Sequence, residues 1–446
     1  MTWINIPIVI GDRELNRIIE RKERFSDFLF VLWAGGGALV AYFLVYMLRK
    51  AFTASTFDGL ELFGLDYKVV ISVTQVIGYL ISKLCGIKIV SELKRKHRLP
   101  AIIISVTCAE VSLILFALLP YPINFLCLFF NGLSLGCMWG FLFAYLEGRK
   151  LTDLLASFLG VSIIISSGAA KSFGLLVLSF DVSPFWMPAM VGGASLPLLI
   201  LIAYFLNKLP EPTLEDRAYR TERVPLDGKQ RMALLKTYGV LLVPLLTVNV
   251  LFTVLRDIKE DFLVDILRHT SLNLSPFLFL RIDAIVTFVL LIVLGSMILI
   301  KDNKIALNAL MLLMLLGSLL VLSTSLFFEH LSTTPILWLF LQSMGIYTSY
   351  LAFQTVFFDR FIAHFRIAGN VGFFIYLADF LGYLFSCVFL LGKSVFNVHI
   401  NWLHYYNSLS VIISLICIFS VGIAFVSMSF QQKNLNSYVE AEIESC

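Results

Sequence analysis

Long apolar runs, separated by short polar or charged segments, dominate the pattern of this 446-residue chain. Runs such as 101–119 and 305–326 contain few polar side chains. A helix of about 20 apolar residues matches the hydrocarbon thickness of a bilayer, whereas a barrel strand would show about ten residues of alternating polarity. The pattern therefore predicts an all-α membrane protein with about twelve transmembrane helices.

The polar stretch 209–231, which contains three prolines, divides the predicted helices six and six. The predicted spans are 27–50, 67–85, 100–119, 122–147, 154–179, 185–207, 233–256, 276–300, 305–328, 335–358, 370–392 and 405–430. The predicted domains are a cytoplasmic amphipathic segment 1–26, a six-helix half 27–207, a cytoplasmic linker 208–232, a second half 233–430 and a cytoplasmic tail 431–446. This is the organisation of major facilitator transporters, so we expect a major-facilitator-type fold by analogy.

Composition supports the membrane assignment. Hydrophobic residues make up 59% of the chain and charged residues 14%, against about 25% charged residues in soluble domains. The seven cysteines form no CxxC pair, and we interpret them as small buried apolar side chains rather than a disulfide or metal framework. We expect no metal, no cofactor and no nucleic acid partner, and a monomer in the lipid bilayer. We find no nucleophile–base pair at a recognisable spacing, so the sequence does not predict an enzyme.

Lysine and arginine are distributed unevenly over the connecting segments. If the N-terminus lies inside, the inner segments carry roughly 23 lysine and arginine residues and the outer segments carry about seven. The seven are Arg49, Lys50, Lys68, Arg256, Lys259, Arg268 and Lys393. Both termini are therefore expected in the cytoplasm. The segment 257–275 is expected to be an outer loop.

Three predicted helices carry polar residues along one face. Because an ionisable side chain among lipid tails is costly, these residues should face the interior of the bundle. They are Tyr42, Tyr46, Arg49 and Lys50 in the first helix, Gln75, Tyr79 and Lys83 in the second, and Asn249, Thr253 and Arg256 in the seventh. Spacings of three and four place each set on one helix face. We interpret them as a candidate substrate-binding site.

Arg49 lies 22 residues after position 27, and Arg256 lies 23 residues after position 233. In a protein built from two repeats, the two arginines would meet across the pseudo-two-fold axis, where paired guanidinium groups suit a phosphate or carboxylate. The alternative is that both arginines extend from helix ends to the outer membrane interface, and that Lys83 extends to the inner interface.

Further charges lie inside the predicted spans. Lys171 follows Ser166, Ser167 and Gly168 in an apolar run, which predicts that it faces a cavity or forms an ion pair, and we add it to the candidate binding site. Three carboxylates are candidates for coupling to protons: Asp379, Glu110 and Asp283. Structural ion pairs between helices explain these groups equally well.

The run Tyr46-Met-Leu-Arg49-Lys50-Ala-Phe52 resembles the first-helix motif of the organophosphate–phosphate antiporter family of the major facilitator superfamily. The second-helix motif Tyr79-Leu-Ile-Ser82-Lys83 and the seventh-helix Leu255-Arg256 are similar to that family as well. The resemblance implies that Arg49 and Arg256 bind a phosphoryl group, that Lys50 and Lys83 add positive charge, and that Tyr42 and Tyr46 line the site.

The chain also departs from that family. The usual Asp-Arg and Gly-Arg-Arg loop after the second helix is absent from 86–96, and the helix-five histidine is replaced by the stretch that ends in Lys171. The Leu146–Arg149 run resembles a divergent set of uncharacterised major-facilitator-like proteins.

The leading hypothesis is a secondary transporter in a bacterial inner membrane that moves a small, phosphorylated organic anion by alternating access, in exchange for inorganic phosphate. A proton-coupled symporter of a carboxylate or other solute, with Asp379 or Glu110 titrating, is an alternative. A non-transporting membrane sensor on the same fold is another.

Overall fold

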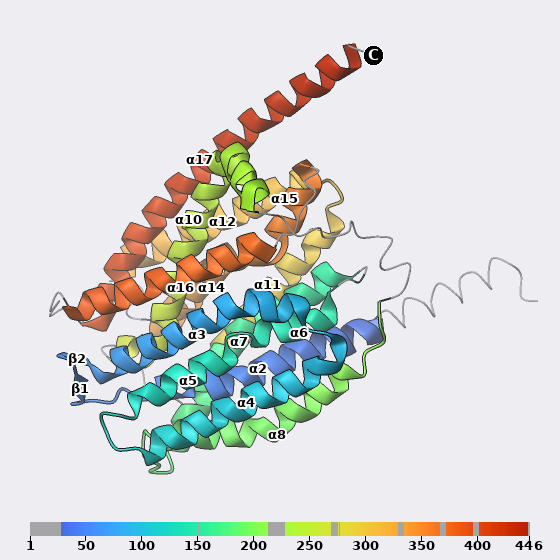
Figure 1. The fold of residues 1–446 in the computed structure, drawn as a ribbon. Coiled ribbons are helices and arrows are strands. Elements are labelled where there is room, and N and C mark those ends of the chain that lie inside the picture. The colour runs from blue at the N-terminus through green and yellow to red at the C-terminus, as the bar shows by residue number, and fades with distance from the viewer. Residues whose placement is uncertain are drawn as a thin grey trace, which may run out of the picture.

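The computed structural model describes residues 28–147, 149, 151–212, 228–268, 275, 277–328, 334–365, 372–395 and 401–444. The predicted N-terminal segment 1–26 and most of the predicted linker lie outside these ranges. Of the predicted tail, the backbone of 431–444 continues the last helix. Within the described ranges the protein is built from helices and one short hairpin (Figure 1).

The first half consists of α2 (Gly37–Lys50), α3 (Tyr67–Glu92), α4 (Arg95–Leu118), α5 (Phe125–Leu135), α6 (Met138–Leu146), α7 (Thr152–Leu178) and α8 (Met187–Asn207). A π-helical turn, Leu32–Gly36, leads into α2, and a 3₁₀ turn, Ala51–Ala54, follows it. The second half consists of α10 (Gly228–Leu267), α11 (Leu278–Ser296), α12 (Asn303–Leu326), α14 (Pro335–Leu351), α15 (Phe358–Phe365), α16 (Gly372–Val395) and α17 (Trp402–Glu444). A 3₁₀ turn, Met297–Leu299, follows α11, and a π-helical turn, Ala352–Phe357, joins α14 to α15.

Eleven helices of the described residues have the length and hydropathy of a membrane span, and α16 contains a shorter apolar stretch, Leu377–Gly392. Each of the twelve predicted spans therefore has a helical counterpart, and the prediction of an all-α, multi-pass membrane protein is confirmed. Large apolar side chains such as Phe288 and Phe419 are 66% and 71% exposed on the outside, where lipid would cover them. Charged side chains such as Arg256 are buried inside, as a bilayer requires.

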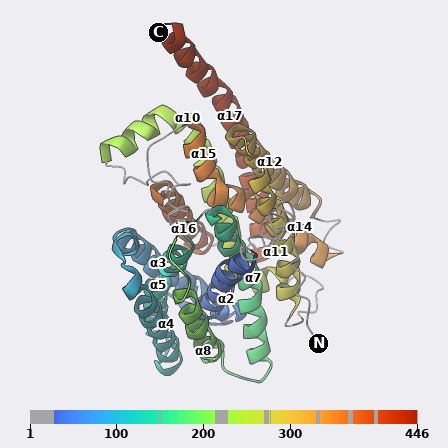
Figure 2. The same cartoon turned by 90° about the vertical axis from the view of Figure 1, so that its right-hand side faces the viewer.

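The helices of the first half pack mainly on each other, with α2 against α7 and α8, and α5 against α3 and α4. The second half packs α10 and α12 against α17, and α12 against α14. The main contacts between the halves are α7 with α11 and α3 with α16, and both views separate the two groups of helices (Figures 1 and 2).

A two-stranded hairpin, β1 (Glu61–Leu62) and β2 (Leu65–Asp66), marks one end of the bundle, which we call the hairpin face. Its turn residues Phe63 and Gly64 have φ of 59° and 71°, as a tight two-residue hairpin turn requires. The opposite end, which carries the described linker residues 208–212, is called the linker face. The sequence predicted only a loop over 51–66, because two-residue strands leave too little pattern.

Several helix bounds differ from the prediction. The segment 86–99 is mostly helical, since α3 extends to Glu92 and α4 begins at Arg95. The fourth predicted span is divided into α5 and α6 at Gly136 and Cys137.

The prediction of an outer loop over 257–275 is wrong for its first part. Helix α10 continues to Leu267, with non-helical backbone angles at Phe262. Charged residues of this extension are buried rather than solvated, because they pair with side chains of opposite charge from other helices: Asp261 with Lys50 and Lys259 with Asp283.

Candidate functional site

Arg49 is the last but one residue of α2, and its side chain is buried between the two halves with 3% exposure. Its Nε and Nη1 atoms have no hydrogen-bond partner among the described residues. It forms no ion pair with a described carboxylate. Its guanidinium carbon lies 3.9 Å from the ring centroid of Tyr79. The residue therefore does not extend to the membrane interface but presents unpaired donors inside the protein.

Arg256 of α10 is 1% exposed, but unlike Arg49 it already has partners. Its Nη2 and Nε donate to Asp257 Oδ1 at 2.7 and 3.1 Å, and Nε lies 3.9 Å from Glu260 Oε1. Its guanidinium carbon lies 4.4 Å from the ring centroid of Tyr350. The two arginines predicted to form a symmetric pair are therefore electrostatically different.

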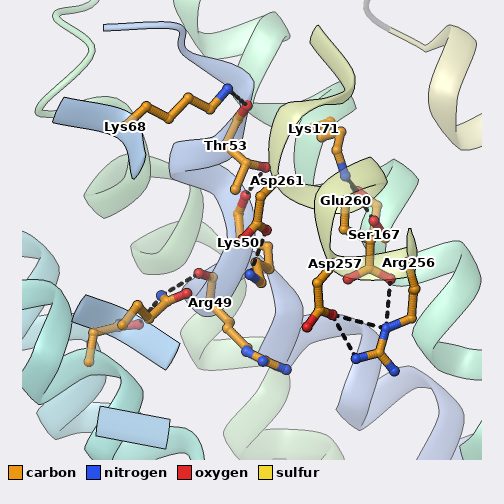
Figure 3. A network of polar contacts seen from close by, with 12 residues as sticks. Arg49, Lys50, Thr53, Lys68, Ser167, Lys171, Arg256, Asp257, Glu260 and Asp261 are labelled. Atoms are coloured by element: carbon orange, nitrogen blue, oxygen red, sulfur yellow. Dashed lines mark hydrogen bonds and ion pairs between the residues drawn. The ribbon is translucent and has the colours of Figure 1, made fainter. Parts of the chain in front are cut away.

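The ring of Tyr383, from α16, connects the two arginines. The guanidinium carbons of Arg49 and Arg256 lie 5.7 and 5.5 Å from its centroid. Figure 3 shows both head groups extending into the same region from α2 and α10. The structure thus brings together the residues that the repeat argument paired, with tyrosine rings around them.

Tyrosines from both halves surround Arg49. Tyr46 of α2 lies 5.5 Å from its guanidinium carbon and 5.5 Å from the ring of Tyr42. Tyr79 of α3 contacts Tyr383 edge to face at 5.1 Å, across the interface between the halves. Such rings stabilise a cation electrostatically but neutralise no charge, so the site keeps its positive potential.

Gln75 binds the backbone of Arg49. Its Nε2 donates to the Arg49 carbonyl oxygen at 2.7 Å and to Asn131 Oδ1 at 2.8 Å. Asn131 Nδ2 donates in turn to the Leu48 carbonyl oxygen at 3.0 Å. This amide network holds the C-terminal end of α2, so Gln75 positions Arg49 within the candidate site.

Lys83 and Asp379 form an ion pair that joins α3 to α16, on the linker-face side of Arg49. Asp379 also accepts a hydrogen bond from Gln354 Nε2 at 2.6 Å. Their side chains are 10% and 16% exposed, more than those of Arg49 and Arg256. The candidate substrate lysine and the candidate coupling carboxylate are thus partners of each other.

The buried extension of α10 contributes groups that the sequence analysis missed. Lys50 pairs with Asp261 at 2.6 Å, and Lys259 lies 3.6 Å from Asp283 (Figure 3 shows the first pair). Glu260 accepts a hydrogen bond from Tyr347 at 2.9 Å. A signal was available in the sequence: the carboxylates at 257, 261 and 265 repeat every four residues, which places them on one face of a continuing helix.

Lys171 of α7 is 1% exposed and donates to Ser167 Oγ at 2.8 Å. It forms no ion pair with a described carboxylate, although Glu260 and Asp283 interact with it electrostatically. Asn249 of α10 is fully buried, and neither of its amide atoms has a partner among the described residues. Both are therefore polar groups held inside the bundle.

Glu110 is the candidate that lies apart from the others. Its carboxylate faces Gly192 and Gly193 of α8, within the first half rather than between the halves. No group of histidine, cysteine and carboxylate side chains in the described residues is arranged to hold a metal ion.

Known structures with a similar fold are transporters by name. The human organic anion transporter MFSD10 (TETRAN) matches with a TM-score of 0.52 and 15% identity, over 89% of this chain and 98% of that chain. The nucleoside transporter NupG matches with a TM-score of 0.57 and 15% identity, over 90% of this chain and 99% of that chain. A D-xylose–proton symporter matches with a TM-score of 0.55 and 14% identity, over 87% of this chain and 96% of that chain. The expected major-facilitator-type fold, in two six-helix halves, is confirmed.

Sequence comparisons give a family but no closer relative. No curated protein matches the chain significantly. A family model does match, over residues 51–433, which run from the end of α2 through most of α17 and include all the candidate residues after Lys50. The chain therefore belongs to the family described as a family of unknown function, DUF5690.

Proposed function

We propose that this protein is a secondary transporter that moves a small organic anion by alternating access. The three similar structures are transporters of organic anions, nucleosides and a sugar by their names, and they support transport only by analogy of fold. The observation that carries the proposal is the buried Arg49 guanidinium, which has no counter-charge among the described residues. Burying an unpaired charge costs several kcal/mol, so an anionic ligand that supplies the partner binds favourably.

The chemistry of Arg49 suits an oxyanion. A guanidinium offers parallel N–H donors that match the oxygens of a carboxylate or phosphate. The resemblance to organophosphate antiporters favours a phosphorylated substrate, with exchange for inorganic phosphate. Such an exchange needs no titrating carboxylate, because substrate and counter-substrate alternate at the same arginine.

Of the four ion pairs between the halves in the described residues, three lie toward the hairpin face and one, Lys83–Asp379, toward the linker face. The three are Lys50–Asp261, Lys68–Asp265 and Asp58–Arg268. They favour an arrangement in which substrate reaches Arg49 from the linker face. From the lysine and arginine distribution, we propose that this face is cytoplasmic, with both termini inside, and that the protein is a monomer in a bacterial inner membrane.

The first experiment measures ligand-induced thermal stabilisation of the purified protein. Inorganic phosphate, sugar phosphates, glycerol phosphate, monocarboxylates and dicarboxylates are titrated separately. A ligand that binds only the folded state at 100 times its Kd stabilises it by about 2.7 kcal/mol, which raises the melting temperature. We expect stabilisation by at least one anion class and its loss in Arg49→Gln.

Arg360→Gln is the matched control, because it removes the same charge from a different site. Arg360 donates to Asn303 and to the Met297 carbonyl oxygen within the second half. If no anion stabilises folded wild-type protein, or if Arg49→Gln and Arg360→Gln respond alike, the anion site is refuted. Uptake into proteoliposomes then distinguishes transport from binding alone.

Proton-coupled symport is the second candidate, and the Lys83–Asp379 pair is the observation that favours it. Protonation of Asp379 would break an ion pair between the halves and so couple a proton to their movement. This candidate predicts uptake driven by a pH gradient and lost in Asp379→Asn, with Asp181→Asn at an exposed turn as the control. Uptake that ignores the gradient argues for exchange.

A further inference from the structure

The charged side chains buried between the two halves do not balance among the described residues. The cations are Arg49, Lys50, Lys68, Lys83, Lys171, Arg256 and Lys259. The carboxylates are Asp257, Glu260, Asp261, Asp265, Asp283 and Asp379, of which Asp265 and Asp379 are 14% and 16% exposed. Glu110 is not part of this set, because it faces α8 within the first half. The cluster therefore has one positive charge in excess.

The contacts locate this excess at Arg49. Lys50, Lys68, Lys83 and Lys259 each have a carboxylate partner from a different helix. The other two carboxylates lie beside Arg256: Asp257 bonds to it directly, and Glu260 is in electrostatic range of both Arg256 and Lys171. In the described part of the cluster, only the Arg49 guanidinium is then left without a counter-charge.

We infer that the substrate binds as a monoanion. This rests on the proposed anion transport and narrows its phosphorylated candidates to singly charged forms, such as phosphodiesters and the monoanion of inorganic phosphate. A head group with one negative charge, such as a carboxylate, a sulfonate or a phosphodiester, neutralises Arg49 and leaves the cluster balanced. A dianion, such as a phosphate monoester above its second pKa of about 6, brings one charge too many into a buried site. The surplus charge would lack a cation and would be repelled by Asp257.

The surroundings of Arg49 agree with a single bound head group. Tyr79 covers one face of the guanidinium at 3.9 Å, so oxygen atoms must approach along the edge that carries the N–H donors. Arg256 is held by Asp257 through two hydrogen bonds on its Nε–Nη2 edge, and this carboxylate already neutralises its charge. Asp257 thus acts as the group that sets the charge of the ligand.

The test compares each dianion with the monoanion of the same skeleton at about pH 8, where phosphate monoesters are doubly charged. Suitable probes are methyl phosphate with dimethyl phosphate, and succinate with monomethyl succinate. Apparent affinities come from thermal-shift titrations of the full-length protein in detergent. We expect the monoanion of each pair to bind about tenfold more tightly, a difference of about 1.4 kcal/mol.

Two variants make the inference sharper. Asp257→Asn releases Arg256 and adds one positive charge, so we expect the preference to move toward the dianion by about tenfold. Asp58→Asn makes the same charge change at the hairpin face and should leave the preference unaltered. Where Asp257→Asn does not fold, Glu260→Gln provides the same change of charge in the cluster.

The outcomes separate this inference from the proposed function. Tighter binding of monoanions by the wild type, moved toward dianions by Asp257→Asn alone, supports it. Tighter binding of dianions by the wild type overturns the charge rule but leaves anion transport standing. Absence of binding by every probe refutes the anion site itself, and the charge rule with it.

Discussion

Arg49 and Arg256 illustrate how two identical side chains at corresponding positions acquire different roles. Both are buried and both lie over the ring of Tyr383. The residue that follows each arginine makes the difference. Lys50, after Arg49, forms an ion pair with Asp261, whereas Asp257, after Arg256, forms an ion pair with Arg256 itself. The pseudo-symmetry of the helices is therefore not a symmetry of charge.

At the residue scale, a substitution of Gln75 tests whether its hydrogen bonds hold Arg49 in place. In Gln75→Leu, the Arg49 carbonyl oxygen and Asn131 Oδ1 both lose their donor. Leaving buried polar atoms unpaired costs roughly 1–3 kcal/mol, so the free energy of unfolding should fall by that amount. Anion affinity should fall as well, but less than in Arg49→Gln. Chemical denaturation and thermal-shift titration measure the two effects.

Ser134→Ala is the control for this substitution, since Ser134 bonds only to the preceding turn of α5 and is exposed. If Gln75→Leu and Ser134→Ala destabilise equally, the amide network has no special part in holding Arg49.

The ion pair of Asp58 with Arg268 predicts a pH dependence. Arg268 donates to the two Asp58 carboxylate oxygens at 2.8 and 2.5 Å, and these bonds lower the pKa of Asp58 below its ordinary value. The stabilisation is therefore complete above the ordinary aspartate pKa of about 3.9 and is lost as the pH falls through the lower pKa of the folded protein. Since the side chains are 58% and 54% exposed, it stays below about 1 kcal/mol.

We expect Asp58→Asn to lower the free energy of unfolding at pH 7 by this small amount, and by less at pH 3, which lies below the ordinary aspartate pKa. Denaturant titrations of both proteins at the two pH values measure the difference. A deficit that grows in acid would contradict the assignment.

At the element scale, glycines permit α3 and α5 to pack with their backbones in contact. A Cβ atom at Gly132 would lie 2.0 Å from the Gln75 carbonyl oxygen, and one at Gly78 would lie 2.1 Å from the Phe129 carbonyl oxygen. Both glycines are in sequence-distant helices that meet face to face, so the close approach is mutual. This packing places Gln75 beside the end of α2 and thereby shapes the candidate site.

Gly132→Ala should therefore destabilise the protein by roughly 1–3 kcal/mol, because backbone must move to admit the methyl group. Gly422→Ala in α17 is the control, since nothing lies within 4 Å of a Cβ there. A helix gains up to about 1 kcal/mol from such an exchange in the absence of clashes. Thermal unfolding in detergent compares the two, and equal stability of both variants would exclude tight α3–α5 packing.

At the scale of the whole molecule, ion pairs across the interface hold the halves together near the hairpin face. Lys50–Asp261 is the most deeply buried, with side chains 3% and 0% exposed. Lys68–Asp265 and Asp58–Arg268 follow toward the surface, where exposure rises. Alternating access requires all three to separate when the hairpin face opens, so their strength sets which conformation prevails.

Lys50→Met should destabilise this conformation by roughly 3–5 kcal/mol, because Asp261 remains buried and charged without a partner. The double variant Lys50→Met with Asp261→Leu should recover most of this loss. A cysteine placed at Ser55, which is 6% exposed, should react faster with a membrane-impermeant reagent in the single variant than in the double variant. Equal labelling rates would show that the pair does not hold the hairpin face closed.

The order of apolar runs was enough to predict twelve helices, because a span in a bilayer must be apolar along its whole length and this requirement is local in sequence. The helical spacing of Tyr42, Tyr46 and Arg49 likewise predicted one polar face, since side-chain direction follows from the helix repeat. These properties need no knowledge of what a helix packs against.

Partners of the charges were decided only by the tertiary structure. The segment after Arg256 looked like an outer loop because its charges are unfavourable in lipid. Lysines of α2 and α3 pair with its carboxylates, and Asp283 of α11 pairs with its Lys259, so that burial becomes favourable. Lys50 pairs with Asp261, 211 positions away along the chain, whereas no described carboxylate from another helix pairs with Arg49. Electrostatic balance is a sum over neighbours in space, and sequence order does not contain that sum.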